Sequence, residues 1–272
     1  METIRLVAAL AVQKGWTIYQ LDVKSAFLHG ELNEVVFVEQ PCGYVQKGNE
    51  QKVYRLKKAL YGLKQAPRAW YSRIEAYFMK EGFEKCDYEH TLFIKTSKEG
   101  KVLIVSLYVD DLIFTGNDEL MFTEFKNSMK HEFDMTDLGK MRYFLGLEVL
   151  QRSDGVFISQ KKYALEVLKQ FGMDKSNFVH NPIVPSFKLM KDEGGVKVDN
   201  TYYKQIAAKR VLRYLKGTTE FGIFYKKGVV DDELATYTDS DYAGDLEDRK
   251  RTSGYVFLLS SGAVSWSSRK NQ

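Results

Sequence analysis

Two adjacent aspartates, Asp110 and Asp111, stand between two apolar runs, and this pattern restricts the fold more than any other in the chain. The runs at 102–107 and 112–116 are rich in β-branched and aromatic residues, which is typical of buried strands. Two like charges at the tip of an apolar hairpin repel each other, and partial burial makes it costly to ionise both. A divalent cation would offset that cost, and Mg²⁺ supports phosphate chemistry. The pattern therefore predicts a hairpin that carries a metal site.

A third carboxylate, Asp22, lies in another apolar run at 19–23. Only tertiary folding can bring it to the Asp110–Asp111 pair. Convergence would create a site for two metal ions, roughly 3.5–4 Å apart, that clamps the attacking and leaving oxygens of a phosphoryl transfer. Asp is also common in turns, so each position alone is better explained as a turn residue. The combination of the two positions favours the metal site.

Several motifs resemble those of a known family. The runs at 22–27 (Asp-Val-Lys-Ser-Ala-Phe), 62–70 (Gly-Leu-Lys-Gln-Ala-Pro-Arg-Ala-Trp) and 108–111 (Tyr-Val-Asp-Asp) resemble the A, B and C motifs of reverse transcriptases. The residues of these motifs are similar to those of copia-type long-terminal-repeat retrotransposons, in the plant TNT-like group. The runs at 138–149 and 207–218 agree with this family, and 238–244 resembles the opening of its ribonuclease H domain. The resemblance covers nearly the whole chain, in the family's order.

This resemblance implies roles for individual residues. Asp22 and Asp110 would bridge both metal ions, with Asp111 more peripheral, and the metal would be Mg²⁺, with Mn²⁺ as a substitute. The residues that would contact substrate are Val23, Phe27, Gln65, Arg68 and Tyr108. The residues that resemble the primer grip, a hairpin that presses the primer end toward the metals, are Tyr143, Phe144, Leu145 and Gly146. Asp239 resembles the first carboxylate of ribonuclease H.

Some of these residues have a second explanation. Phe27 resembles the ring that excludes a ribose 2′-hydroxyl, yet Phe is usually a core residue. The basic residues Lys57, Lys58, Lys64 and Arg68 would follow the template backbone or form a solvated face. Packing alone would also explain the aromatic hairpin at 143–146, and Asp239 without its partner carboxylates would be inert.

Alternating strands and helices with hairpins predict an α/β (α+β) fold. The family's palm, a mixed or antiparallel sheet packed on helices, fits this pattern and would be followed by the start of a ribonuclease H-like domain. We expect a reverse-transcriptase palm with partial fingers at 1–158 and a shortened thumb or connection at 159–235. A linker near 181–201 is rich in charges, with two prolines and two glycines. The fragment at 236–272 would belong to ribonuclease H.

Hydrophobic periodicity predicts most of the individual elements. Helices are expected at 3–14, 67–80, 117–131 and 161–171, together with one that joins 202–206 to 207–210. Strands are expected at 17–22, 35–40, 53–56, 91–95, 102–108, 142–150 and 155–160. The strands at 255–260 and 263–267 would form a hairpin without a covering helix, which is marginal alone.

Composition narrows the functional class. The 272 residues are 44% hydrophobic and carry a net charge of +4, which suits a folded domain and permits nucleic-acid binding without requiring it. Cys42 and Cys86 have no metal-ligand spacing, which indicates free thiols in a reducing compartment. We expect no signal peptide and no membrane partner, because apolar runs are too short to span a bilayer. The family implies a cytoplasmic virus-like particle or the nucleus.

The resemblance also implies missing parts. The chain starts inside the family pattern, without upstream fingers strands, and it stops before the later ribonuclease H carboxylates. The runs at 202–206 and 207–210 are separated by several dozen residues in the family. We therefore expect a fragment of an RNA-directed DNA polymerase, a nucleotidyltransferase, with very low polymerase activity and an inactive ribonuclease H part. Template–primer, deoxynucleoside triphosphates and other parts of the Pol polyprotein are the expected partners. The alternative is a decayed or domesticated remnant that at most binds nucleic acid.

Overall fold

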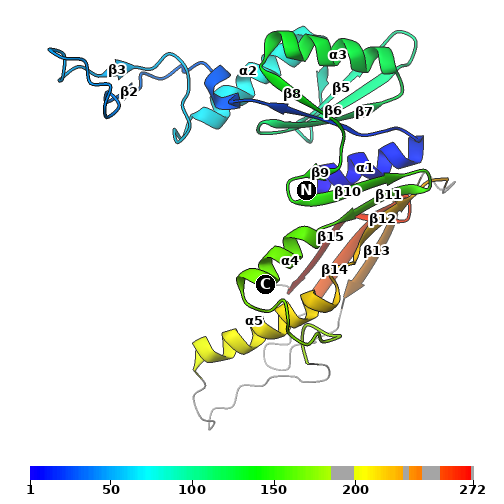
Figure 1. Ribbon diagram of the computed structural model, residues 1–272. Helices are drawn as coiled ribbons and strands as arrows, with labels where there is room; N and C mark the ends of the chain where they lie inside the picture. Colours follow the sequence, from blue (N-terminus) through cyan, green and yellow to red (C-terminus); the bar gives the residue numbers. More distant parts are fainter. Residues whose placement is uncertain (185–198, 229–232, 241–251, 271–272) are drawn as a thin grey trace. The chain divides into compact units, whose positions relative to one another are not determined.

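The computed structural model describes residues 1–184, 199–228, 233–240 and 252–270 (Figure 1). The chain divides into two compact units. One, called here the central unit, is Trp16–Met141, and the other, the terminal unit, combines Met1–Gly15 with Arg142–Gln272. Each unit is described by itself.

A six-stranded sheet forms the frame of the central unit, with the strand order β4-β5-β6-β7-β1-β8. All of its neighbouring strands are antiparallel. The strands are β1 (Tyr19–Val23), β4 (Glu84–Lys85), β5 (Leu92–Thr96), β6 (Val102–Tyr108), β7 (Asp111–Gly116) and β8 (Met135–Lys140). Strands β6 and β7 are the predicted apolar runs on either side of the aspartates, and they pair as a hairpin.

Helices α2 (Ala66–Lys80) and α3 (Glu119–Glu132) pack on one face of this sheet. Pro67 lies in the first turn of α2, where its missing N–H costs no helical hydrogen bond. The Asp118 side chain caps α3 by accepting a hydrogen bond from the Met121 N–H at 2.9 Å. The 3₁₀ helix η1 (Ala26–His29) follows β1, and the short strands β2 (Phe37–Val38) and β3 (Tyr54–Arg55) pair on a long excursion that reaches away from the sheet (Figure 1).

The two faces of the central sheet differ in what they carry. Side chains alternate between the faces of a strand, and directly paired antiparallel residues share a face. Leu103, Val105 and Leu107 of β6 and Leu112 and Phe114 of β7 point into the core beneath α2 and α3. The opposite face therefore receives Gln20 and Asp22 from β1 and Asp111 and Ile113 from β7.

The terminal unit contains two antiparallel sheets, with strand orders β12-β11-β10-β9 and β13-β14-β15. Its helices are α1 (Glu2–Lys14), α4 (Lys161–Gln170) and α5 (Asn200–Gly217). Its strands are β9 (Tyr143–Phe144), β10 (Leu147–Arg152), β11 (Gly155–Ser159), β12 (Gly222–Lys226), β13 (Ala235–Ser240), β14 (Thr252–Leu259) and β15 (Gly262–Lys270). No helix in these described stretches, or in those of the central unit, is long and apolar enough to cross a membrane.

Helix α1 packs against β15, at the other end of the sequence. The Arg5 Nε–H donates to the Val264 carbonyl at 2.8 Å, and the Arg5 guanidinium lies 4.2 Å from the Trp266 ring centroid. The Ser265 hydroxyl donates to the Glu2 carboxylate at 2.7 Å. The expectation of a hairpin without a covering helix is therefore wrong. The apolar face of α1 and the β14–β15 hairpin each need a partner, and they cover one another.

The predicted fold class is confirmed, with helices and antiparallel sheets in both units. Several details differ from the expectation, since β4, β12 and β13 were not among the expected strands. Strand β8 was not predicted, and the strand expected at 142–150 is broken at Leu145 and Gly146 into β9 and β10. Residues 185–198 of the expected linker and 241–244 of the ribonuclease H run lie outside the described residues. The domain limits expected from the sequence stay a prediction.

Candidate active site

Backbone pairing brings the three aspartates to one end of the central sheet. Asp22 of β1 is the direct antiparallel partner of Asp111 in β7. The next residue along β1, Val23, donates its N–H to the Asp110 carbonyl at 2.9 Å. Side chains that are 88 residues or more apart in sequence, at 22 and 110–111, thus lie at the same hairpin tip. Their role as catalytic metal ligands stays a prediction.

The hairpin tip itself is strained. Tyr108 pairs with Asp111, so that Val109 and Asp110 form a two-residue turn. Val109 has a φ of 57°, a left-handed conformation that is unfavourable for a β-branched residue. The indole N–H of Trp70, on α2, donates to the Val109 carbonyl at 2.5 Å. Strained backbone of this kind persists only where the surroundings hold it, and it is common at functional sites.

Electrostatics at the tip disfavours charge on the aspartates. Partial burial, and then the charge of Asp110, raise the pKa of Asp22 above its ordinary value of 3.8, while nearby Lys24 opposes this rise. Burial also raises the pKa of Asp111, and the charges of Asp110 and Asp22 add to that rise. The hydrogen bond from the Gln20 amide to the Asp111 carboxylate, at 3.0 Å, acts in the opposite direction.

These shifts predict how stability depends on pH. A carboxyl whose pKa is raised by folding binds its proton more tightly in the folded state, so its ionisation destabilises the fold as pH rises from 3.8 through the raised pKa. We therefore expect Asp22→Asn to be more stable than the wild-type protein at pH 7. The difference should vanish at pH 3, where the carboxyl is protonated in both states. Urea unfolding at the two pH values measures this, and a less stable Asp22→Asn protein at pH 7 would contradict it.

The donor set suits a hard cation held partly by substrate. Within the described parts of the chain, no three His, Cys, Asp or Glu side chains form a ready-made metal site. The Asp111 carboxylate accepts a hydrogen bond from Gln20, whereas Asp22 and Asp110 interact with each other through their charges. Mg²⁺ is typically bound by one or two carboxylates together with substrate phosphates and water, so two such oxygen donors fit it.

The residues expected to contact substrate lie on different elements of the central unit. Phe27, in η1, is half-buried, packs against the core and lies 4.8 Å from the Tyr61 ring, measured between ring centroids. This packing is compatible with both explanations of Phe27. Gln65 precedes α2 and Arg68 is exposed in its first turn, where helix N–H groups attract phosphate. Tyr108 is half-exposed at the end of β6.

The remaining predicted site residues belong to the terminal unit. Tyr143 and Phe144 form β9, and Leu145 and Gly146 turn the chain into β10 with φ values of 49° and 78°. The Tyr143 hydroxyl donates to the Glu148 carboxylate at 2.9 Å, while Phe144 is buried. Asp239 is exposed on β13.

Sequence reasoning missed three residues that support the tip: Gln20, Gly30 and Trp70. Gln20 had a local signal, because a polar residue two positions before Asp22 shares its face of an otherwise apolar strand. Trp70 stands out in the sequence only as part of a motif, and its contact with Val109 crosses 39 positions. Gly30 gave no signal in the sequence.

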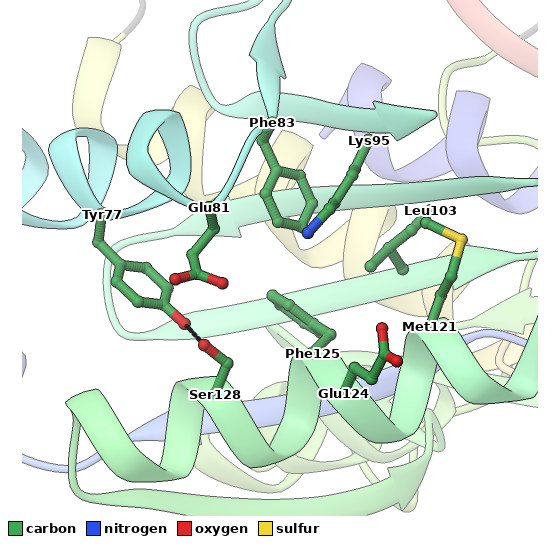
Figure 2. A pocket seen from close by; sticks show the side chains of 9 residues that line it. All are labelled: Tyr77, Glu81, Phe83, Lys95, Leu103, Met121, Glu124, Phe125 and Ser128. Carbon is green, nitrogen blue, oxygen red and sulfur yellow. Dashed lines mark hydrogen bonds between the residues drawn. The ribbon is translucent and has the colours of Figure 1, made fainter. Parts of the chain in front are cut away.

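A separate cavity of about 160 Å³ lies on the helix-covered face of the central sheet (Figure 2). Figure 2 shows the Tyr77 and Ser128 hydroxyls, which are hydrogen-bonded at 2.5 Å, bridging α2 and α3 at its side. Its lining comprises Tyr77, Glu81, Phe83, Lys95, Leu103, Met121, Glu124, Phe125 and Ser128. None of these residues belongs to the hairpin tip, so the cavity is distinct from the aspartate site.

Comparison with known proteins gives matches over the whole chain. Residues 1–185 match the family described as reverse transcriptase (RNA-dependent DNA polymerase). The chain is 36% identical over 305 residues to the retrovirus-related Pol polyprotein from transposon RE1 of Arabidopsis thaliana, covering 99% of the chain and 21% of that protein. It is 33% identical over 312 residues to the corresponding polyprotein from transposon TNT 1-94 of Nicotiana tabacum, covering 99% of the chain and 23% of that protein.

A third similar protein is of comparable length. The putative transposon Ty5-1 protein of Saccharomyces cerevisiae is 29% identical over 286 residues, and the match covers 92% of each chain. By contrast, the chain spans only about a fifth of the plant polyproteins. The 305 residues of the RE1 match exceed the 272 of this chain by 33, so that relative has additional residues inside the matched region.

Proposed function

Because this chain belongs to the reverse transcriptase family and is a fragment of an RNA-directed DNA polymerase, we propose that its hairpin tip is a nucleotidyl-transfer centre. The single observation that carries the proposal is the pairing of Asp22 with Asp111 beside Asp110. It gathers carboxylates at a strained turn, where their charges oppose one another without a cation.

In the proposed reaction, a primer 3′-hydroxyl attacks the α-phosphate of a deoxynucleoside triphosphate, and pyrophosphate leaves. Mg²⁺, when bound, would activate the hydroxyl and stabilise the charge on the leaving oxygens. Asp22 and Asp110 would hold the metal, with the Val23 carbonyl as a further oxygen donor. Mn²⁺ would substitute for Mg²⁺.

Other residues of the central unit would position the substrate. Arg68 and the free N–H groups at the start of α2 are suited to phosphate, and Gln65 would contact the nascent base pair. The Phe27 ring, held against Tyr61, would lie beneath the sugar and clash with a 2′-hydroxyl. In the terminal unit, the β9–β10 turn would contact the primer. The partners would be template–primer and deoxynucleoside triphosphates, and other parts of a Pol polyprotein would complete the enzyme.

Primer extension tests this function directly. The chain is incubated with a template–primer and deoxynucleoside triphosphates, with Mg²⁺, with Mn²⁺, or with a chelator. Incorporation that requires either metal supports the proposal. Binding of template–primer without incorporation under any of these conditions would instead favour a remnant that only binds nucleic acid.

Binding of template–primer should weaken steeply with salt. Phosphate contacts release counterions when the complex forms. A plot of the logarithm of the binding constant against the logarithm of the salt concentration therefore has a negative slope, and its magnitude grows by about 0.9 for each phosphate neutralised. Lys64 and Arg68 are exposed around the start of α2. We expect Lys64→Ala and Arg68→Ala each to reduce the slope by about 1. Fluorescence anisotropy at several salt concentrations measures the slope.

The matched control for this prediction is Lys98→Ala. Lys98 is exposed in the β5–β6 turn, at the opposite end of β6 from Val109. Loss of its charge changes the net charge equally and should leave the slope unchanged. Equal slopes for all three variants would show that the start of α2 makes no phosphate contact.

A further inference from the structure

The β6–β7 turn is held from two sides through its backbone. The carbonyl of Val109 accepts from the Trp70 indole of α2 at 2.5 Å, and the carbonyl of Asp110 accepts from the Val23 N–H of β1 at 2.9 Å. These two consecutive carbonyls fix the peptide planes on both sides of Asp110. The direction of the Asp110 side chain toward Asp22 therefore depends on both contacts.

Only the Trp70 contact acts on the strained residue. Val109 has a φ of 57°, and its β-branched side chain gives the turn no intrinsic reason to adopt that conformation. Glycine is the usual residue at such a position, because it has no Cβ penalty. The hydrogen bond from the buried Trp70 indole holds Val109 in this conformation, which the Val109 side chain alone does not favour.

The position of the indole is itself fixed. Trp70 is only 1% exposed and packs edge-on against Phe133, with ring centroids 5.4 Å apart. Helix α2 approaches η1 closely at Gly30, where an added Cβ would lie 2.7 Å from the backbone nitrogen of Trp70. The indole N–H therefore cannot turn to another acceptor without disturbing the core.

We propose that Trp70 is a positioning residue that holds Val109 in the left-handed conformation, so that the turn presents Asp110 beside Asp22. This inference rests on the proposed function, because it assigns to the Asp22–Asp110 pair a task that requires their proximity. Trp70 touches neither substrate nor metal in this role and acts only through the turn.

The test is a cycle of two substitutions, Trp70→Phe and Val109→Gly. Phe keeps a large ring in the core but removes the N–H donor, and Gly allows a positive φ without external support. Two quantities are measured: the sign of φ at position 109, from backbone NMR couplings of the metal-free protein, and the affinity for Mn²⁺, from paramagnetic resonance titration. Loss of a supporting hydrogen bond at a metal site typically weakens metal binding about 10- to 100-fold.

The expected result is a change in both quantities for Trp70→Phe, with Mn²⁺ affinity reduced about 10- to 100-fold. In the Val109→Gly background, Trp70→Phe should have little further effect, because glycine no longer needs the indole. Such rescue would not follow if Trp70 only filled the core. Tyr77→Phe is the matched control, since it removes the hydrogen bond to Ser128 from the same helix and should change neither quantity.

The proposal is overturned if Trp70→Phe leaves either the Val109 conformation or the Mn²⁺ affinity as in the wild-type protein, or if Val109→Gly gives no rescue. Asp110→Asn separates this failure from failure of the proposed function. Wild-type Mn²⁺ binding that is insensitive to Asp110→Asn would refute the metal site itself, while the conformation of Val109 would still decide whether the indole controls the turn.

Discussion

Asp110→Asn is expected to slow Mg²⁺-dependent incorporation of deoxynucleotides by orders of magnitude. The substitution keeps the shape of the side chain and removes its charge, so a metal bound as proposed would lose one of its two carboxylates. Metal-ion stabilisation of the transition state supplies several kcal/mol. Because each 1.36 kcal/mol corresponds to a tenfold change in rate, we expect kcat to fall by about 10²–10⁴-fold. Single-nucleotide extension of a labelled primer, at saturating triphosphate, measures this rate.

The control is Asp87→Asn, an identical chemical change in the same unit. Asp87 is on the bend after β4 and lies outside the hairpin tip. Its substitution should leave the rate unchanged. Incorporation by the Asp110→Asn protein at the wild-type rate would mean that the reaction is catalysed elsewhere. Comparable losses in both variants would point to a general effect on folding, since the removal of negative charge should not weaken template binding.

Gly30→Ala should destabilise the central unit strongly. Gly30 has an extended backbone, with φ −74° and ψ 131°, which alanine also adopts. Replacement of glycine by alanine at a compatible position normally stabilises by about 0.4–1 kcal/mol, through the unfolded state. Here the added Cβ would lie 2.7 Å from the Ala69 carbonyl carbon and the Trp70 nitrogen. Since backbone atoms cannot rotate away, overpacking should reverse the sign and cost about 1–3 kcal/mol or more.

Urea unfolding measures this change in a Trp266→Phe background, where the remaining fluorophores, Trp16 and Trp70, both belong to the central unit. Ala69→Gly in the same protein serves as the second-site control. Because the close contacts are with the helix backbone, removal of the Ala69 methyl group should not restore stability. A stabilised Gly30→Ala protein, or rescue by Ala69→Gly, would show that α2 has room to move at this point.

The parts of the fold that follow from local chemistry were predictable. The Asp118 cap of α3, the left-handed Gly15 that ends α1 and the apolar strands β6 and β7 all have signals within a few residues. Strand β8 does not, because its Met-Thr-Asp-Leu-Gly-Lys sequence has no clear alternation. It is a strand because it pairs with β1, across a register shift between Gln20 and Leu21.

In the candidate site, too, residues with a local sequence signal were predictable and residues that act through tertiary packing were not. The aspartates were predictable because a charged group in an apolar strand is costly in any fold. The supports of the turn did not stand out, since Trp70 and Gly30 act through packing that only the folded chain creates. The partner of α1 was equally hidden, because an amphipathic helix indicates that one face is covered but not by which residues.

The contact between α1 and β15 also sets an order of events during synthesis. Arg5 and its acceptor Val264 are 259 positions apart. At about 5–20 residues per second, the helix leaves the ribosome roughly 13–50 s before its partner strand is made. The central unit is continuous in sequence and is complete well before that strand appears. Throughout this interval the apolar face of α1 lacks β15, and transiently exposed apolar surface of this kind makes incomplete chains prone to aggregation.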